Sequence, residues 1–307
     1  MRHSFNFHSN GKLLISGEYL VIDGALSLAL PVRYGQSLHV EVADGQPYLL
    51  WESRVKGNEW FTAGYRLPEL DIVSASDQEI AGRLQILLRN ASSLNPDMLG
   101  GSCEIKALAD IGFDLNLGLG SSSTLISNIA WWFNVDPFQL FRTTFNGSGY
   151  DIACARSAQA VLYQVVDNNP VIRQVKFDPP FRDQLFFVHL GKKQDTLSGI
   201  RHYRSSVVES QKEIERISAI SDYLWQTTDL YEFERLLIEH ESIISRILGI
   251  EPVKESHFSD LPGSVKSLGA WGGDFILVTW YRSRQELEKY FHSKGLKTIY
   301  SFDELIL

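Results

Sequence analysis

The chain lacks several features that would assign it to a protein class at once. Only two of its 307 residues are cysteine, and Cys103 and Cys154 form neither a CxxC pair nor a metal-ligand cluster. This argues against a disulfide-rich scaffold and predicts reduced structural thiols in a cytoplasmic protein. No apolar run approaches the roughly 20 residues of a membrane helix. The N-terminal segment also has no apolar run of signal-peptide length, so we expect neither a membrane span nor a secretory signal.

An excess of positive charge is also missing. The formal net charge of -8 leaves no electrostatic footprint for nucleic acid or for an anionic membrane. A small anion remains compatible with this charge, because an anion site is local. The 44% hydrophobic content is enough for a substantial core, and the length suggests two lobes. We therefore expect a small-molecule substrate and a monomer or homodimer, without nucleic-acid or membrane partners.

Two familiar phosphate-binding signatures are absent. A Walker loop needs GxxxxGK[ST], but Asn6 stands at its first glycine and Leu13 at its hydroxyl position, on either side of the Gly11-Lys12 pair. A dinucleotide fingerprint needs GxGxxG, and Ser123 occupies its third glycine position. The sequence therefore predicts neither a P-loop nor a Rossmann domain.

Hydrophobic periodicity predicts an α+β fold. Apolar residues at helical spacing favour a helix over residues 76–94, and alternation favours a strand near 38–42. Residues 102–108 are a further strand candidate. Two prolines after Asp178 mark a lobe boundary, which predicts lobes over 1–178 and 179–307. Strands are expected at 162–166, 171–177, 184–190, 275–280 and 297–300, and helices in two parts of 205–248 and at 284–294.

A glycine-rich turn at residues 117–124, Leu-Gly-Leu-Gly-Ser-Ser-Ser-Thr, precedes an apolar helical stripe. Its glycines allow a phosphate to approach the backbone, and the helix that follows presents free N–H groups at its positive end. Serine hydroxyls suit phosphate or Mg²⁺, and serine is a favoured helix N-cap. Considered alone, the turn is equally well explained as an ordinary helix start.

Three further segments contain glycine at informative positions: Asn10-Gly-Lys-Leu-Leu-Ile-Ser-Gly-Glu-Tyr-Leu-Val21, Gly147-Ser-Gly-Tyr-Asp-Ile-Ala153 and Lys266-Ser-Leu-Gly-Ala-Trp-Gly-Gly-Asp274. Together with the turn at 117–124, and in this order, they resemble the motifs of the GHMP kinase superfamily, closest to its mevalonate and phosphomevalonate kinases. The resemblance implies an N-terminal, ATP-binding lobe like ribosomal protein S5 domain 2 and a ferredoxin-like C-terminal lobe.

The resemblance also implies roles for individual residues. Lys12 and Asp151 match the catalytic lysine and aspartate, and Ser122 matches the serine that ligates Mg²⁺. Phosphoryl transfer depends on positioning and charge stabilisation, which suits this pair. The residues expected to line the ATP triphosphate are Gly118, Leu119, Gly120, Ser121, Ser122 and Ser123, and those of the supporting loop are Gly269, Gly272 and Gly273.

A cationic segment follows the expected strand at 184–190. Lys192, Lys193 and Arg201, with His202 and Arg204, would suit an anionic group on the acceptor, although a solvated basic face explains them equally well. Glu18 is a further candidate substrate residue. The alternative for Glu18 is a structural role in which its carboxylate pairs with a nearby cation.

Several positions depart from the motifs that the chain resembles. Asn10 and Asp114 replace prolines, Trp271 replaces a glycine, and Leu140 stands where mevalonate kinases carry an acidic Mg²⁺ ligand. These departures leave open a non-catalytic nucleotide-binding protein of the same fold. The resemblance also leaves open a kinase acting on a sugar or amino acid and, more weakly, a decarboxylase. The leading expectation is an ATP- and Mg²⁺-dependent kinase of mevalonate or phosphomevalonate.

Overall fold

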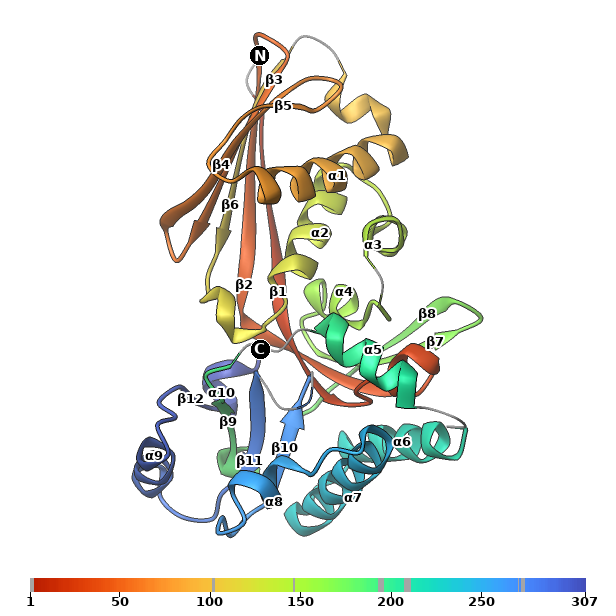
Figure 1. Cartoon of the computed structure of the whole chain (residues 1–307), viewed down its shortest axis with the longest axis vertical. Helices are drawn as coiled ribbons and strands as arrows, with labels where there is room; N and C mark the ends of the chain where they lie inside the picture. Colours follow the sequence, from red (N-terminus) through yellow and green to blue (C-terminus); the bar gives the residue numbers. More distant parts are fainter. Residues whose placement is uncertain are drawn as a thin grey trace. The chain divides into compact units, whose positions relative to one another are not determined.

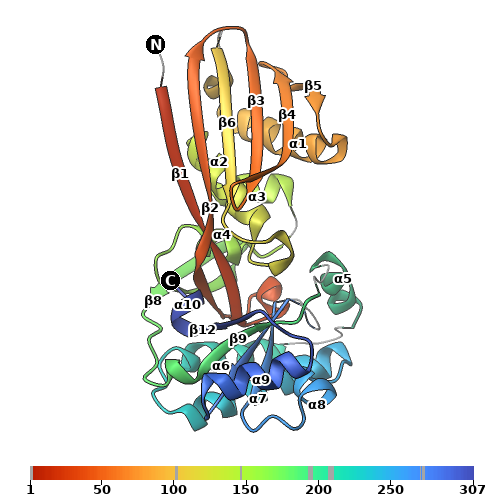
Figure 2. The same cartoon turned by 90° about the vertical axis from the view of Figure 1, so that its left-hand side faces the viewer.

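The computed structural model describes residues 3–100, 103–145, 147–192, 196–206, 211–269, 271 and 274–307. The chain divides into two compact units, each made of several segments (Figures 1 and 2). Unit 1 comprises Met1–Gly11, Tyr34–Leu115 and Leu119–Arg156, and unit 2 comprises Lys12–Arg33, Asn116–Gly118 and Ser157–Leu307. The lobe boundary expected at residue 178 stays a prediction.

Unit 1 is a sheet with helices on one face (Figure 1). The strand order is β5-β4-β3-β6-β2, with β1 also paired to β2, and the β3–β6 pair is parallel whereas β2–β6, β3–β4 and β4–β5 are antiparallel. The strands are β1 (His3–Ser16), β2 (Ser27–Asp44), β3 (Tyr48–Val55), β4 (Asn58–Arg66), β5 (Asp71–Ala75) and β6 (Cys103–Ile111). The strands β1 and β2 continue into unit 2.

Helices α1 (Gln78–Leu94), α2 (Ser121–Trp132), α3 (Pro137–Thr144) and α4 (Tyr150–Ala155) complete unit 1. Helix α1 begins after Asp77, whose carboxylate accepts hydrogen bonds from the amides of Glu79 and Ile80. Its apolar stripe packs with Leu38 and Val40 of β2 in one core cluster. The alternating apolar residues of β2 and the helically spaced apolar residues of α1, both visible in the sequence, are therefore the two faces that pack together.

Unit 2 contains a second sheet with strand order β10-β11-β9-β12, in which every pair is antiparallel. Its strands are β9 (Leu185–His189), β10 (Val265–Leu268), β11 (Phe275–Thr279) and β12 (Ile299–Ser301). The hairpin of β7 (Ala160–Val166) and β8 (Asn169–Val175) pairs with the first part of β2. The helices are α5 (Thr196–Ser206), α6 (Gln211–Leu224), α7 (Leu230–Leu248), α8 (Val253–His257), α9 (Arg284–Ser293) and α10 (Phe302–Leu305).

Helices α8 and α9 cover the face of this sheet that carries Phe186, Val188 and Ile276. Helix α7 packs beside α6 and against β10. Asp229 caps α7 at its start, and Gly249, with a φ of 65°, ends it in the left-handed conformation that glycine favours. The expected α+β class is confirmed, as are the two helical patterns of residues 205–248. Helices α3, α4, α5, α8 and α10 and strands β5 and β10 were not predicted.

Short 3₁₀ turns link these elements, at Leu20–Asp23, Pro96–Leu99, Leu115–Leu117 and Arg182–Gln184. None of the helices in the described ranges is long and apolar enough to cross a membrane.

Candidate functional site

Three of the glycine-bearing segments meet within unit 2. Lys12, near the end of β1, donates from its Nζ atom to the carbonyl of Gly118 at 3.3 Å. Gly118 has a φ of 67°, and a Cβ atom there would collide with the carboxylate of Asp274. Glycine is therefore required at this position both for its conformation and for the close approach. One lysine, one glycine and one aspartate, from three distant segments, form a single contact group.

Asp274 also ties this group to Lys192. The amide of Asp274 donates to the Lys192 carbonyl at 3.0 Å. Lys192 is exposed, and the contact with Asp274 is made by its backbone. Lys192 thus adjoins Asp274, and its expected role as a substrate residue stays a prediction.

The remaining cations of the expected clamp differ from Lys192. Arg201 is exposed on α5. His202 contacts the Leu248 carbonyl through Nε2 at 2.8 Å, and Arg204 pairs with Asp23 at 2.5 Å, so both have structural partners. Lys193 lies outside the described residues.

Unit 1 supplies the helix that follows the glycine-rich turn. Helix α2 begins at Ser121, and its N-cap is Gly120, with a φ of 92° and no side-chain cap. The expectation of a serine N-cap is therefore wrong, because the backbone enters the helix through a left-handed conformation that glycine adopts readily. Ser123 is buried and donates to the Gly120 carbonyl at 2.9 Å, whereas Ser122 is exposed.

The first amides of α2 are the groups that suit an anion. The first helical bond at this end runs from the Thr124 amide to the Gly120 carbonyl at 3.0 Å. The amides of Ser121, Ser122 and Ser123 precede it, so helix geometry gives them no intrahelical acceptor. Leu119 is fully buried and anchors the turn. Exposed Ser122 and these amides have a chemistry that suits a phosphate and Mg²⁺, and the site stays a prediction.

Asp151 lies in the first turn of α4, one residue after Tyr150. The helix enters through Gly149, with a φ of 87°, so Asp151 is not the N-cap residue that an ordinary helix start would require. Helix α4 packs against α2, and Arg156 donates to the Ser127 hydroxyl at 3.2 Å and to its carbonyl at 3.0 Å. Lys12 belongs to unit 2 and Asp151 to unit 1, and their pairing stays a prediction.

A buried ion pair joins the first and last glycine-bearing segments. Lys266 is fully buried, and its Nζ atom lies 2.5 Å from Glu18 Oε1 and 2.8 Å from the Ser267 carbonyl. His240, from α7, places Nε2 3.0 Å from Glu18 Oε2 and 2.9 Å from the Gly17 amide nitrogen. The Nε2 atom of His240 can bond to only one of these two groups at a time: it donates to the Glu18 carboxylate when protonated and accepts from the Gly17 amide when not.

The pKa values in this cluster follow from burial and from the neighbouring charges. Burial would raise the pKa of Glu18, but the charges of Lys266 and His240 overcome this and lower it to about 2. Burial raises the pKa of Glu241, 3.8 Å from Lys266, to about 8. Burial, followed by the charge of Lys266, lowers the pKa of His240. Glu18 is thus a paired carboxylate, which matches the structural alternative left open by the sequence.

Sequence reasoning missed Asp274, His240 and Glu241 as partners in these contacts. A signal was present in α7, where His240 and Glu241 interrupt a stripe of buried residues that includes Leu237 and Ile244. Polar side chains on such a stripe need partners elsewhere in the fold. In the supporting loop, Gly269 has a φ of 75° with open space around it, whereas Gly272 and Gly273 lie outside the described residues.

Metal ions are commonly bound by clusters of His, Cys, Asp and Glu side chains. In the described ranges, no group of three or more His, Cys, Asp or Glu side chains is placed to hold a metal ion. Mg²⁺ commonly takes only one or two protein ligands together with phosphate oxygens and water. The hydroxyl of Ser122 fits that pattern.

No protein-family model matches the sequence, and no curated protein matches it. Solved structures do. One match is Streptococcus pneumoniae phosphomevalonate kinase in complex with phosphomevalonate and AMPPNP. The match covers 97% of this chain and 99% of that chain, with a TM-score of 0.71 and 14% sequence identity. The chain has the GHMP kinase fold.

Two further structures show that this fold does not select one substrate. L. major mevalonate kinase in complex with R-mevalonate matches with a TM-score of 0.66 and 15% identity, over 98% of this chain and 95% of that one. Lactococcus lactis galactokinase complexed with galactose matches with a TM-score of 0.70 and 12% identity, over 97% and 93%. The GHMP kinase fold is therefore shared with both acid and sugar kinases, and the branch is not resolved.

Proposed function

We propose that this protein is an ATP-dependent kinase that transfers a phosphoryl group to a hydroxyl of a small metabolite. The observation that carries the proposal is the contact of Lys12 with Gly118, whose other side packs against Asp274. This contact group brings together three of the four segments that resemble the kinase motifs. A fold shared with small-molecule kinases supports the same conclusion.

In this proposal the helix start at Ser121–Ser123 binds the ATP phosphates through backbone amides, and the Ser122 hydroxyl helps to hold Mg²⁺. Lys12 places a positive charge where negative charge develops on the transferred group. Asp151 orients the acceptor hydroxyl or accepts its proton. Bound ATP supplies the phosphoryl group. Because the Glu18 carboxylate is already paired with Lys266 and contacts His240, we assign Glu18 a structural role. Lys192 and Arg201 remain candidate contacts of the acceptor.

The leading acceptors are mevalonate and phosphomevalonate, on the strength of the motif resemblance. A sugar or amino-acid acceptor is the next candidate, since the fold is shared with galactokinase. A non-catalytic nucleotide-binding protein is the second candidate function. It is favoured by Trp271, which places a buried indole where the motif has glycine, and by Leu140, a fully buried apolar residue at the expected acidic ligand.

Coupled ADP release tests the proposal, with MgATP and a panel of hydroxy acids, their phosphates, sugars and homoserine. We expect turnover with at least one acceptor, and Asp151→Asn should lower kcat at least about a hundredfold because the hydroxyl loses its base or anchor. Asp183→Asn, an exposed aspartate of unit 2, is the matched control.

Nucleotide binding is measured separately by calorimetry. Tight MgATP binding with no turnover across the panel would favour the non-catalytic alternative. Full activity in Asp151→Asn would remove the active-site assignment, even if the protein is a kinase.

A further inference from the structure

His189 is a buried histidine of unit 2 whose two ring nitrogens both have backbone partners. The residue ends β9 and is 5% exposed. Its Nε2 atom lies 3.1 Å from the carbonyl oxygen of Asn116, and the Gly191 amide donates to its Nδ1 atom at 3.2 Å. A ring nitrogen that accepts a hydrogen bond carries no proton, so the proton of the neutral ring is on Nε2. His189 is therefore a neutral imidazole that donates to Asn116.

The bond to Asn116 holds the chain just before the glycine-rich turn. Asn116 lies in the 3₁₀ turn Leu115–Leu117, two positions before Gly118. The carbonyl of Gly118 accepts the hydrogen bond from Lys12, and the chain then continues into α2. His189 thus fixes the backbone that leads directly to the residues assigned to Lys12 and to the ATP phosphates in the proposed function.

The backbone after His189 reaches the same turn by a second route. The Leu190 amide donates to the Asp274 carbonyl at 2.8 Å, and the Asp274 amide donates to the Lys192 carbonyl at 3.0 Å. The Asp274 carboxylate in turn lies against Gly118. One short segment therefore contacts the turn directly through an imidazole and indirectly through Asp274.

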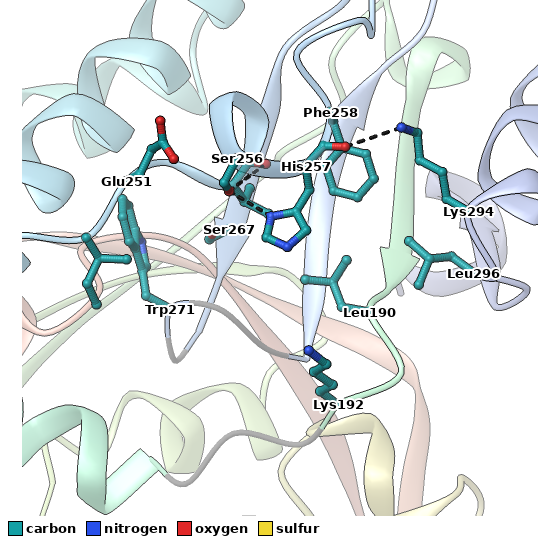
Figure 3. A pocket seen from close by; sticks show the side chains of 12 residues that line it. Leu190, Lys192, Glu251, Ser256, His257, Phe258, Ser267, Trp271, Lys294 and Leu296 are labelled. Atoms are coloured by element: carbon teal, nitrogen blue, oxygen red, sulfur yellow. Dashed lines mark hydrogen bonds between the residues drawn. The ribbon is translucent and has the colours of Figure 1, made fainter.

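This segment also borders a cavity. Leu190 and Lys192 line a space of about 500 Å³, and Phe258 and Trp271 form other parts of its wall (Figure 3). Side chains that border a void lack packing contacts on that side. The position of the segment therefore depends more on its hydrogen bonds than it would in a fully packed core.

The second sheet fixes the orientation of the His189 ring. The backbone amide of His189 donates to the Thr298 carbonyl at 2.9 Å. Phe275 stands opposite His189 in the β9–β11 register, and the two ring centroids are 5.1 Å apart in an edge-to-face arrangement. A ring held on these sides presents its Nε2 proton in one direction, towards Asn116.

We propose, on the basis of the kinase function above, that His189 is a positioning residue. Its neutral imidazole holds the backbone at Asn116, so that the glycine-rich turn meets Lys12 and the ATP phosphates in the geometry that transfer requires. Small displacements of groups that hold a substrate lower its binding and turnover. His189 acts through Asn116 and is given no contact with nucleotide or acceptor.

Three substitutions at His189 separate the roles of the two ring nitrogens. His189→Phe keeps an aromatic ring and loses both hydrogen bonds. A glutamine amide can donate from near the Nε2 position, whereas the shorter asparagine reaches only the Nδ1 position. In calorimetry with MgATP, Kd should rise about three- to tenfold in His189→Phe and His189→Asn, and stay within about twofold of wild type in His189→Gln. His292→Phe, at an exposed histidine of α9, is the control and should bind as the wild type does.

Three further measurements distinguish positioning from a merely structural role. In the ADP-release assay the KM for MgATP should rise with Kd, while the KM for the acceptor stays unchanged. Hydrogen exchange without nucleotide should be faster at residues 116–120 in His189→Phe than in wild type, and unchanged in β8. Nitrogen NMR of the imidazoles, with His189 assigned by the signals lost in His189→Gln, should show its proton on Nε2 alone at neutral pH.

The proposal is overturned if His189→Phe and His189→Asn bind MgATP as the wild type does, or if His189→Gln binds no better than His189→Asn. A proton on Nδ1, or a fall in the free energy of unfolding without a change in MgATP affinity, overturns it as well. The NMR measurement uses the wild type and stays decisive if His189→Phe does not fold. If the wild type has no kinase activity, the proposed function fails, and the calorimetric, exchange and NMR results still decide whether His189 holds the turn.

Discussion

Two lysines of unit 2, Lys12 and Lys266, lie in motif-like segments. Their surroundings differ, and the difference distinguishes a structural lysine from one that is available for catalysis. Lys266 is fully buried against the carboxylate of Glu18. Lys12 is only partly buried and contacts a neutral carbonyl, that of Gly118. A fully buried charge is tolerated only with a fixed partner, whereas a partly exposed charge is also open to a ligand. The comparison predicts that losing Lys266 costs stability and that losing Lys12 costs activity.

The largest expected effect is on stability in Lys266→Met. Removing the ammonium leaves the Glu18 carboxylate buried beside His240, and breaking such a pair costs about 3–5 kcal/mol of the free energy of unfolding. Urea unfolding followed by circular dichroism measures this. Lys176→Met, which breaks an exposed pair with Asp178, is the control and should change the free energy little.

The double variant Glu18→Gln with Lys266→Met sharpens the same test. It removes both charges, so it should be more stable than Lys266→Met alone, because no unpaired carboxylate remains. If Lys266→Met lowers the free energy of unfolding by less than about 1 kcal/mol, or if the double variant does not recover stability, the buried pair does not stabilise the fold as proposed.

The next effect is on turnover in Lys12→Met. Charge stabilisation by one group at a transferring phosphoryl is worth about 10²–10³ in kcat, so we expect a loss of that order. The free energy of unfolding should change by less than about 1 kcal/mol, since Lys12 is not fully buried. ADP release and urea unfolding on the same preparation compare the two lysines directly. A large stability loss here would make Lys12 a second structural lysine.

The helices and strands of the fold could be predicted from the sequence better than the contacts between their side chains. Hydrophobic spacing identified α1 and the pair α6–α7, because each buries a continuous apolar stripe. The short helices α3 and α4 have too few residues for a periodic signal. Strand β10 was read only as part of a glycine-bearing segment, since its four residues include the charged Lys266.

The candidate site shows the same limit. The Lys12–Gly118 contact agrees with the motif resemblance, but the role of Asp274 depends on a collision distance that no spacing in the sequence contains. Gly120 rather than a serine is the N-cap of α2, because the left-handed backbone conformation there outweighs the usual capping preference. Partners such as Glu18 and Lys266 lie 248 residues apart, and only the fold brings them together.

A smaller effect is expected in the pH dependence of stability, and it tests the charge balance around Lys266. Burial raises the pKa of Glu241 to about 8 from 4.5, so its contribution is present below pH 4.5 and lost as the pH rises through 8. Glu18 is opposite: despite burial, Lys266 and His240 lower its pKa to about 2, so its contribution is lost as the pH falls from 4.5 towards 2.

The substitution Glu241→Gln isolates the alkaline part. Between pH 5 and pH 9 the wild type should lose stability relative to the variant, by on the order of 1–3 kcal/mol. Urea midpoints at the two pH values give the difference. Parallel losses in the two proteins would show that Glu241 is not the titrating group.

The smallest difference is expected between Gly118→Ala and its control Gly57→Ala, and it probes the contact group of Lys12. Both Gly118 and Gly57 have a positive φ, 67° and 80°, so alanine at either costs about 1–2 kcal/mol of backbone strain. A methyl group at Gly57 meets nothing within 4 Å, whereas at Gly118 it meets the Asp274 carboxylate. Gly57→Ala therefore measures the strain alone, and any further loss in Gly118→Ala measures the collision. If Asp274 causes that loss, adding Asp274→Ala to Gly118→Ala should restore part of the stability, whereas an unchanged free energy of unfolding would show that Gly118 is glycine for its backbone alone.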